Sequence, residues 1–220
     1  MTVRAADPPA GRPRGSSLGG VRDAKLREID ERSFLRRLNP MLEVYAAAMD
    51  PPDVQLPGRQ TIMERHASYD GFRALVAERR GALPVLPGPL QGFAYGFHGA
   101  RGQWWHDVVF QALSDREGPE YAESWLDDAF EVAELHVRPE SQGRGLGRAL
   151  LTALCEGRPE RTVVLSTLDR RPDTPARSLY RSVGMTDLLT DFEFPGGGPR
   201  YAVMGGALPL PPYEAGSRRP

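Results

Sequence analysis

The chain has 220 residues, a formal net charge of −1 and a single cysteine. This length suits one domain, or at most two, with a core large enough to need neither disulfides nor metals for stability. Near-neutral charge argues against a dedicated nucleic-acid binder. One cysteine, with no apolar N-terminal signal and no apolar run of membrane-spanning length, indicates a cytoplasmic protein.

The basic residues are almost all arginine. Lys25 is the only lysine among 28 basic residues. A Walker A phosphate loop requires a Gly-Lys-Ser/Thr ending, which the sequence lacks, and a Schiff base would have to use Lys25 in its charged stretch. The composition therefore excludes P-loop chemistry and disfavours a lysine Schiff base.

The first half of the chain predicts strands and helices in alternation. Residues 1–20, rich in Pro and Gly, are predicted to be a flexible tail, and residues 209–220 a second one, which leaves a single domain over 21–208. Within that domain, the apolar spacing predicts the following elements. They are a strand over 25–30, helices over 34–50 and 61–78, with Pro40 as a candidate break in the first helix, and neighbouring antiparallel strands over 83–86 and 90–97.

The second half of the chain continues the alternation, with no internal repeat. Residues 103–128 are predicted to be helical, with an interruption at Gly118-Pro119. After them come a strand over 129–137, a helix over 145–157, a strand over 162–168, a helix over 175–183, and strands over 187–194 and 200–208.

The strand predicted over 129–137 changes its alternation midway. Its large apolar residues are Phe130, Val132, Leu135 and Val137. One extra residue near Ala133 and Glu134 would keep all four on one face, as a β-bulge does, and would leave the last backbone groups free to pair with something other than protein. The alternative is a strand that begins at Glu134 and has no bulge.

Residues 142–150 read QGRGLGRAL, and the next predicted helix begins within these glycines. The segment contains Gly143, Gly145, Gly147, Arg144 and Arg148. Residues without a Cβ let a ligand approach free N–H groups, and the positive end of a helix dipole favours an anion. The segment therefore predicts a diphosphate site. The alternative is a glycine-rich turn that binds nothing.

The glycines do not match a dinucleotide fingerprint. That motif needs a small residue where Arg148 stands, and an acidic residue about 20 positions later at the end of the next strand. Both requirements fail in this sequence.

Two motifs resemble the GNAT (Gcn5-related) N-acetyltransferase family. QGRGLG at 142–147, directly after a strand that ends in VRP at 137–139, is similar to the family's acyl-CoA loop. DTPARSLYRSVGM at 173–185 is similar to the family pattern Asn-x-x-Ala-x-x-x-Tyr-x-x-x-Gly-Phe, with Asp173 in place of Asn and Met185 in place of Phe. The resemblance covers about residues 21–208 and is strong over 129–185.

The resemblance implies a fold and an activity. The fold would be α/β, a GNAT-like mixed, mostly antiparallel sheet of about seven strands, splayed at the β-bulge and flanked by helices. The activity would be direct transfer of an acetyl group from acetyl-CoA to a primary amine, first of a small molecule and second of a protein N-terminus or lysine. A non-catalytic acyl-CoA-binding regulatory module is the rival. A homodimer is a candidate assembly, and no nucleic-acid or membrane partner is expected.

The resemblance also implies the cofactor contacts. Pyrophosphate is expected on the backbone amides of residues 142–148, and the pantetheine arm beside the backbone of the preceding strand. The amide N–H of Val137 is expected to stabilise the oxyanion. The residues implied to contact the cofactor are Leu135, His136, Val137, Gln142, Gly143, Arg144, Gly145, Leu146, Gly147, Arg148, Asp173 and Ala176.

Four residues are candidates for proton transfer. The attacking amine must lose a proton to a base. If the bulge exists, Glu131, Glu134 and His136 project from the strand face opposite the apolar residues, and the resemblance ranks them in that order. Tyr180, on a helix that a threonine caps, is implied to protonate the leaving thiolate. The alternative for the three strand residues is that they are polar side chains facing solvent. The alternative for Tyr180 is an aromatic ring that packs beneath the cofactor.

For three other groups of residues, a structural role or the absence of a functional one is the favoured interpretation. Cys155 could be an acyl-carrying nucleophile, but nothing local lowers its pKa, so a buried bystander is expected. The histidines show no metal-ligand spacing with it, and no metal is predicted. The segment Trp104–His106, with Trp125, could form an aromatic wall of the acceptor pocket, and core packing is the favoured use of Trp105.

Overall fold

The structure of the protein is a computed structural model that describes residues 24–79, 88–169 and 174–211. The predicted tail over 1–20, the predicted strand over 83–86, and residues 212–220 of the second predicted tail lie outside the described residues.

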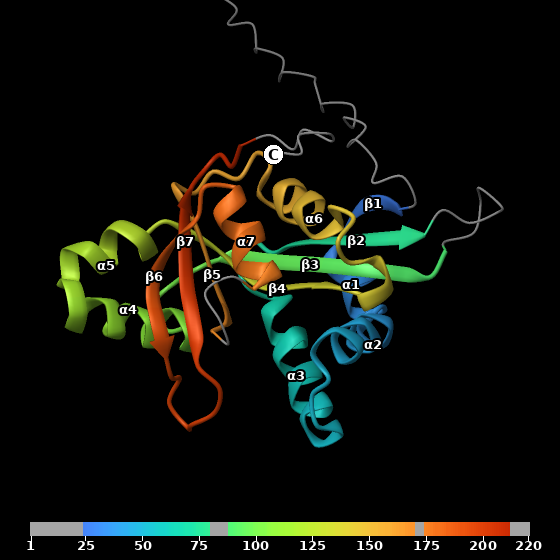
Figure 1. Cartoon of the computed structure of the whole chain (residues 1–220), viewed down its shortest axis with the longest axis horizontal. Helices are drawn as coiled ribbons and strands as arrows, with labels where there is room; N and C mark the ends of the chain where they lie inside the picture. Colours follow the sequence, from blue (N-terminus) through green and yellow to red (C-terminus); the bar gives the residue numbers. More distant parts are fainter. Residues whose placement is uncertain (1–23, 80–87, 170–173, 212–220) are drawn as a thin grey trace, which may run out of the picture.

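The described residues form seven strands, seven α-helices and two short 3₁₀ turns (Figure 1). In chain order they are β1 (Ala24–Ile29), α1 (Glu31–Leu35), α2 (Leu38–Met49), η1 (Asp53–Gln55), α3 (Leu56–His66), β2 (Arg73–Arg79), β3 (Leu90–His98), α4 (Trp104–Glu117), α5 (Pro119–Leu126), β4 (Ala129–Val137), η2 (Pro139–Ser141), α6 (Leu146–Cys155), β5 (Thr162–Leu168), α7 (Pro175–Ser182), β6 (Thr186–Phe192) and β7 (Tyr201–Ala207).

The strands make one sheet in the order β1-β2-β3-β4-β5-β7-β6. All neighbouring pairs are antiparallel except β4 and β5, which run parallel at the centre of the sheet. The prediction of a mixed, mostly antiparallel seven-stranded sheet is confirmed.

Helices cover both faces of the sheet (Figure 1). On one face, α6 and α7 pack against inward-facing residues of β2 to β5 and β7. On the other face, α1, α2 and α3 pack over β2 and β3, while α4 and α5 pack over β5, β6 and β7. These two groups of helices bury separate apolar clusters. On that face, the central strand β4 lies between the two groups of helices, because it stands between β3 and β5 in the sheet.

Most sequence predictions match the structure, but the helix predicted over 61–78 is wrong in its second half. Helix α3 ends at His66, a turn follows in which Gly71 has a φ of +67°, and Arg73–Arg79 form strand β2. Five successive residues of β2 are buried, since helices cover both sheet faces there. A strand buried on both faces gives a continuous apolar run, which periodicity alone cannot distinguish from a helix.

The first predicted helix is interrupted before Pro40. Helix α1 ends at Leu35, and α2 begins at Leu38, so that Pro40 lies in the first turn of α2. Proline is tolerated in the first helical turn because the N–H groups there have no intrahelical acceptor. The interruption at Gly118-Pro119 is where the sequence predicts it, between α4 and α5.

Strand β4 contains the predicted bulge. Tyr95 of β3 pairs with Glu134 and Gly96 pairs with Val132, so Ala133 is the extra residue without a partner in the register. Phe130, Val132 and Val137 all belong to the core cluster beneath α6 and α7, as the bulge requires. The prediction of one apolar face along the whole strand is confirmed.

The bulge coincides with a separation of β4 from β5. Their parallel pairing covers only three residue pairs and ends at Glu131 opposite Val164. From Val132 onward, the edge of β4 that faces β5 has no strand partner among the described residues. The sheet therefore presents a free strand edge at its centre.

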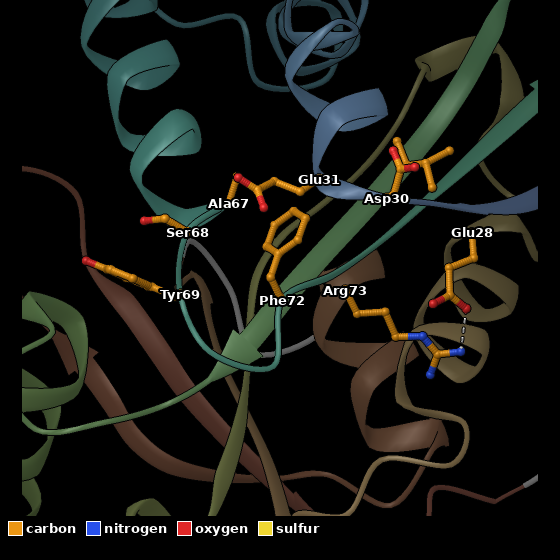
Figure 2. A pocket seen from close by; sticks show the side chains of 9 residues that line it. Glu28, Asp30, Glu31, Ala67, Ser68, Tyr69, Phe72 and Arg73 are labelled. Carbon is orange, nitrogen blue, oxygen red and sulfur yellow. Dashed lines mark hydrogen bonds and ion pairs between the residues drawn. The ribbon is translucent and has the colours of Figure 1, made fainter.

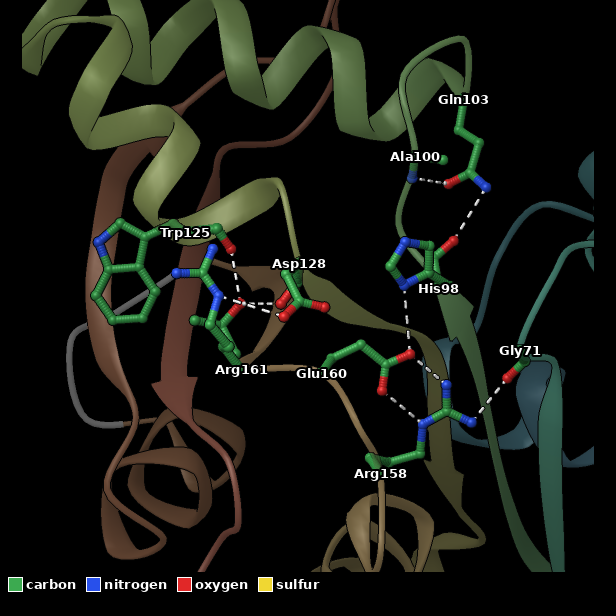
Figure 3. Close-up of polar contacts among 10 residues, drawn as sticks. Gly71, His98, Ala100, Gln103, Trp125, Asp128, Arg158, Glu160 and Arg161 are labelled. Atoms are coloured by element: carbon green, nitrogen blue, oxygen red, sulfur yellow. Dashed lines mark hydrogen bonds and ion pairs between the residues drawn. The ribbon is translucent and has the colours of Figure 1, made fainter.

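A polar network lies at the base of the fork, which is the point where β4 and β5 separate (Figure 3). Arg158, in the loop before β5, donates to the carboxylate of Glu160 and, over 2.9 Å, to the carbonyl of Gly71. Glu160 also contacts His98 at the end of β3, and the Arg158 guanidinium lies 4.2 Å from the ring centroid of Phe130. These contacts hold β3, β4 and β5 together where the separation begins.

Gly96, opposite the bulge, provides a test of this packing. A Cβ at Gly96 would lie 2.3 Å from the carbonyl oxygen of Glu131 and 2.7 Å from the ring of Phe130. Gly96→Ala is therefore expected to lower the free energy of unfolding by about 3 kcal/mol, because backbone or core must shift. Gly58→Ala in α3 is the control, since a Cβ there meets no atom within 4 Å, and it should add up to about 1 kcal/mol. Equal urea midpoints for both variants would contradict the close contact.

Candidate functional site

The free edge of β4 exposes the backbone groups of Val137. The N–H of Arg138 donates to the carbonyl of Gln91 on β3, over 2.8 Å. Because successive residues of a strand direct their backbone groups to opposite edges, the N–H of Val137 points away from β3, to the free edge. The Val137 carbonyl points the same way and accepts from Gln142 Nε2 at 2.9 Å. An extended ligand can therefore pair with this edge.

The glycine-rich segment follows directly and begins α6. Gly143 and Gly145 have φ angles of +70° and +82°, which favour glycine, and Gly145 is the N-cap of α6. No side chain among the described residues caps the first turn of α6. Its first N–H groups and its positive dipole end are thus available to an anion. These features fit the diphosphate of coenzyme A.

Gly147 has a different reason to be glycine. A Cβ at this position would lie 3.0 Å from Leu179 Cδ1 of α7 and 3.7 Å from Leu135 Cδ2 of β4. The residue therefore lets α6 approach α7 and β4 closely. Sequence reasoning treated all three glycines as openings for the ligand, and the structure gives Gly147 a packing role as well.

The two arginines of the segment lie in different environments. Arg148 donates from Nη2 to the carbonyl of Ser182 at the end of α7, over 2.8 Å. Arg144 is exposed, beside the glycines. Arg148 thus joins α6 to α7, and its charge lies toward the end of α7.

The remaining residues predicted to contact the cofactor vary in position. Leu146 is buried in the core, while Leu135 and Ala176 are half-buried against it. Gln142 is exposed apart from its contact with Val137. Asp173 lies outside the described residues.

Glu131 lies where β4 and β5 separate. It is the last residue of β4 that pairs with β5, and only 4% of its surface is exposed. Its Oε2 atom has no hydrogen-bond partner among the described residues. Burial raises the pKa of Glu131 to about 8. A carboxyl group of this kind exchanges its proton near neutral pH.

Glu134 and His136 form a pair beside it on β4. His136 Nε2 contacts Glu134 Oε2, and Arg59 Nη1 of α3 donates to Glu134 Oε1 at 2.8 Å. Burial opposes ionisation of Glu134, but the charges and hydrogen bonds of His136 and Arg59 hold its pKa below the ordinary value. The His136 ring also lies edge-on to Tyr45 of α2, with centroids 5.1 Å apart. Glu134 is therefore a buried carboxylate with both oxygens engaged.

Tyr180 lies on α7 near the same carboxylate. Thr174 accepts a hydrogen bond from Arg177 N and so caps α7, as the sequence predicts. Tyr180 is 7% exposed, and burial together with the negative charge of Glu134 raises its pKa to about 12. The structure thus brings Glu131, Glu134, His136 and Tyr180 to one region of the sheet.

Sequence reasoning missed several residues of this region. Arg59 and Tyr45 meet Glu134 and His136 directly. The charge of Glu134 also acts on Tyr95, on Tyr201 of β7 and on His66 of α3. Arg59 is 75 residues away from Glu134 in the chain. No local pattern around it signals the contact.

Other candidates from the sequence have structural roles. Cys155 is buried, and burial raises its pKa to about 12, which agrees with an inert thiol. Trp105 and Trp125 pack against the core under α4 and α5, and Trp105 Nε1 donates to Ser166 Oγ at 3.1 Å. Trp104 is 56% exposed and lies against Phe194.

The described residues contain no group of three or more His, Cys, Asp or Glu side chains arranged to hold a metal ion. Among the helices of the same residues, none is both long and apolar enough to cross a membrane.

A cavity of about 440 Å³ lies apart from the free edge of β4, between β1, α1 and the turn before β2 (Figure 2). Its lining includes Glu28, Asp30, Glu31, Phe72 and Arg73, and Arg73 donates to Glu28 at 2.9 Å. None of the described residues predicted for the acyl-CoA site lines it. The free edge of β4 remains the candidate site.

Comparisons with known proteins agree with this geometry. The model of the acetyltransferase (GNAT) domain matches residues 105–185. The GCN5-like protein acetyltransferase of Mycobacterium tuberculosis strain H37Rv is 36% identical over 192 residues, which cover 80% of this chain and 93% of that protein.

Solved structures share the fold. A putative GNAT acetyltransferase from Desulfovibrio desulfuricans has a TM-score of 0.57 and 14% identity, covering 84% of this chain and 98% of its own. The putative acetyltransferase yncA of Salmonella typhimurium, solved with its cofactor acetyl-CoA, has a TM-score of 0.51 and 18% identity, covering 90% and 99%. From the uncapped glycine-rich start of α6, the free edge of β4 and these matches, we conclude that the chain belongs to the GNAT family of acetyl-CoA-dependent acetyltransferases.

Proposed function

We propose that the protein transfers the acetyl group of acetyl-CoA directly to a primary amine, with Glu131 as the base. The observation that carries this role is the buried Glu131 carboxyl, with a partnerless oxygen and a pKa of about 8, at the fork between β4 and β5. A base with a pKa near the working pH accepts a proton efficiently. Glu134, which was the second candidate, is already engaged through both oxygens, and this supports a positioning role for it.

Three groups of the chain take part in the proposed reaction. Acetyl-CoA supplies the electrophilic thioester carbonyl and a thiolate leaving group. Glu131 takes the proton that the attacking amine must lose. The N–H of Val137, directed to the free edge, stabilises the oxyanion. Tyr180, kept protonated by its raised pKa, donates its proton to the thiolate; Glu131 then releases its proton to solvent, and Tyr180 regains one from solvent.

Tyr180→Phe tests the last of these roles. Loss of the hydroxyl is expected to lower kcat by about 10-fold to 100-fold, because the thiolate would leave without a proton donor. The ring remains, so the melting temperature and the Kd for acetyl-CoA should stay near those of the wild type. Stopped-flow detection of thiol release measures kcat. An unchanged kcat would reduce Tyr180 to a packing residue.

A protein amine is our first candidate for the acceptor. The supporting observation is that the relative sharing 36% identity over most of its length is named a protein acetyltransferase. The small-molecule amine favoured by the sequence is tested in the same assay.

The deciding experiment follows thiol release from acetyl-CoA in the presence of lysine peptides, peptides with free N-termini, and a panel of small amines. Turnover with peptides above the small amines supports the proposal, and the reverse preference restores the small-molecule acceptor. Tight acetyl-CoA binding without thiol release for any amine would indicate the non-catalytic module.

A further inference from the structure

Arg59 connects the helices beside the site to the bulged strand. Its Nη1 donates to Glu134 at 2.8 Å, its Nη2 donates to the Tyr45 hydroxyl at 3.4 Å, and its guanidinium lies 5.0 Å from the centroid of the Tyr45 ring. These hydrogen bonds occupy two of the five N–H donors of a guanidinium. The side chain is 35% exposed, so further donors remain available to a ligand.

Arg59 lies on the side of the free edge that remains for the acceptor. The glycine-rich start of α6, where the diphosphate fits, belongs to the layer of α6 and α7. Arg59 belongs to α3, in the layer on the opposite face (Figure 1). The charge of Arg59 also acts on Tyr201 at the start of β7. Because the bulge places Glu131 and Glu134 on the same face of β4, the guanidinium bound to Glu134 lies on the face from which Glu131 projects.

The charges around the edge favour an oxygen over a second cation. Glu134 uses one carboxylate oxygen for Arg59 and the other for His136. Glu131 is buried and, with a pKa of about 8, is mostly uncharged at neutral pH. Neither of the two carboxyl groups of β4 is therefore both ionised and unpaired, while Arg59 presents a partly exposed guanidinium. Planar guanidinium groups bind carboxylate and carbonyl oxygens in a fixed geometry.

We propose that Arg59 determines acceptor specificity by binding a carboxylate or carbonyl oxygen next to the reacting amine. The acceptor class is then an amine in a peptide-like setting with an acidic neighbour, and polyamines are excluded. The inference rests on the proposed function, because it assigns the substrate class of the same site.

The test compares peptides that differ only in the residue beside the acceptor amine. One set carries a single lysine and a blocked N-terminus, and a second set carries a free N-terminus and no lysine. The neighbour is Glu, Gln or Arg, and spermidine represents the polyamines. The wild type should show a kcat/KM at least about tenfold higher for Glu than for Arg peptides, and this preference should shrink in 0.5 M salt.

Substitutions in α3 test whether the preference for Glu peptides depends on Arg59. Arg59→Met should reduce the ratio of Glu to Arg peptides to within about twofold of unity. Arg59→Lys keeps a positive charge beside Glu134 but lacks the planar guanidinium. It should therefore fold even if Arg59→Met does not, and it should show an intermediate ratio of Glu to Arg peptides. Arg65→Met removes an exposed arginine from the last turn of the same helix and should retain the wild-type ratio.

The outcomes separate the two proposals. Equal rates of the wild type for Glu and Arg peptides, or an undiminished ratio in Arg59→Lys and Arg59→Met, overturn the inference and leave acetyl transfer intact. Efficient acetylation of spermidine overturns it as well. Absence of turnover with every amine, despite acetyl-CoA binding, refutes the proposed function itself.

Discussion

Glu131→Gln is expected to lower kcat by about 10²-fold to 10⁴-fold, while the Kd for acetyl-CoA changes little, because glutamine cannot take the amine proton. The wild-type kcat/KM, expressed per concentration of unprotonated amine, should rise with pH and level off above about 8, where Glu131 is ionised. The variant should lack this dependence. Steady-state kinetics from pH 6 to 9.5 measure both, and an unchanged kcat would remove Glu131 from the mechanism.

The same substitution has an expected effect on stability. The pKa of Glu131 rises from 4.5 to about 8 on folding, so the unfolded chain loses this proton first, and stability falls as pH rises from 4.5 to 8. Glutamine does not ionise. Glu131→Gln should therefore match the wild type near pH 4 and exceed it by about 4 kcal/mol at pH 8.5. Urea unfolding at both pH values tests this, and a variant less stable than the wild type at pH 8.5 would contradict the buried, uncompensated carboxyl.

Gly145→Asp is expected to weaken acetyl-CoA binding by at least about 100-fold. Gly145 is the N-cap of α6 with a φ of +82°, so a side chain there is strained, and a carboxylate would repel the diphosphate from the uncapped amides. Isothermal titration calorimetry with acetyl-CoA and with CoA measures the loss.

Gly145→Asn separates charge from bulk. Asparagine tolerates positive φ and has nearly the same size as aspartate, but it carries no charge. It should bind acetyl-CoA about tenfold more tightly than Gly145→Asp, and the difference should shrink at high salt. Wild-type affinity in both variants would show that the start of α6 does not bind the cofactor.

Part of the candidate site is readable from local sequence. The glycine-rich segment and the helix around Tyr180 depend on backbone conformation, capping and spacing within about a dozen residues, and the change of alternation before Leu135 marks the bulge. Such features are encoded by neighbours in the chain, so their positions agree with the structure.

Other features depend on contacts between distant segments. The sequence of β2 indicates a helix because burial on both faces removes the alternation that identifies a strand. Gly147 is restricted by Leu179, which belongs to a different helix. Arg59 reaches Glu134 only because α3 packs over the central strands. No pattern within any one of these segments contains the information.

The sequence by itself determined the order of strands and helices apart from β2, together with the bulge in β4 and the glycine-rich start of α6, because these follow from the alternation, capping and φ preferences of adjacent residues. The tertiary structure alone decided the charge states: Glu131 is buried at the fork without a partner, whereas Glu134, three residues later, is held ionised by His136 and Arg59. The difference arises because solvent exclusion and the distance to opposite charges set a carboxyl pKa, and both depend on which distant segments pack around each group.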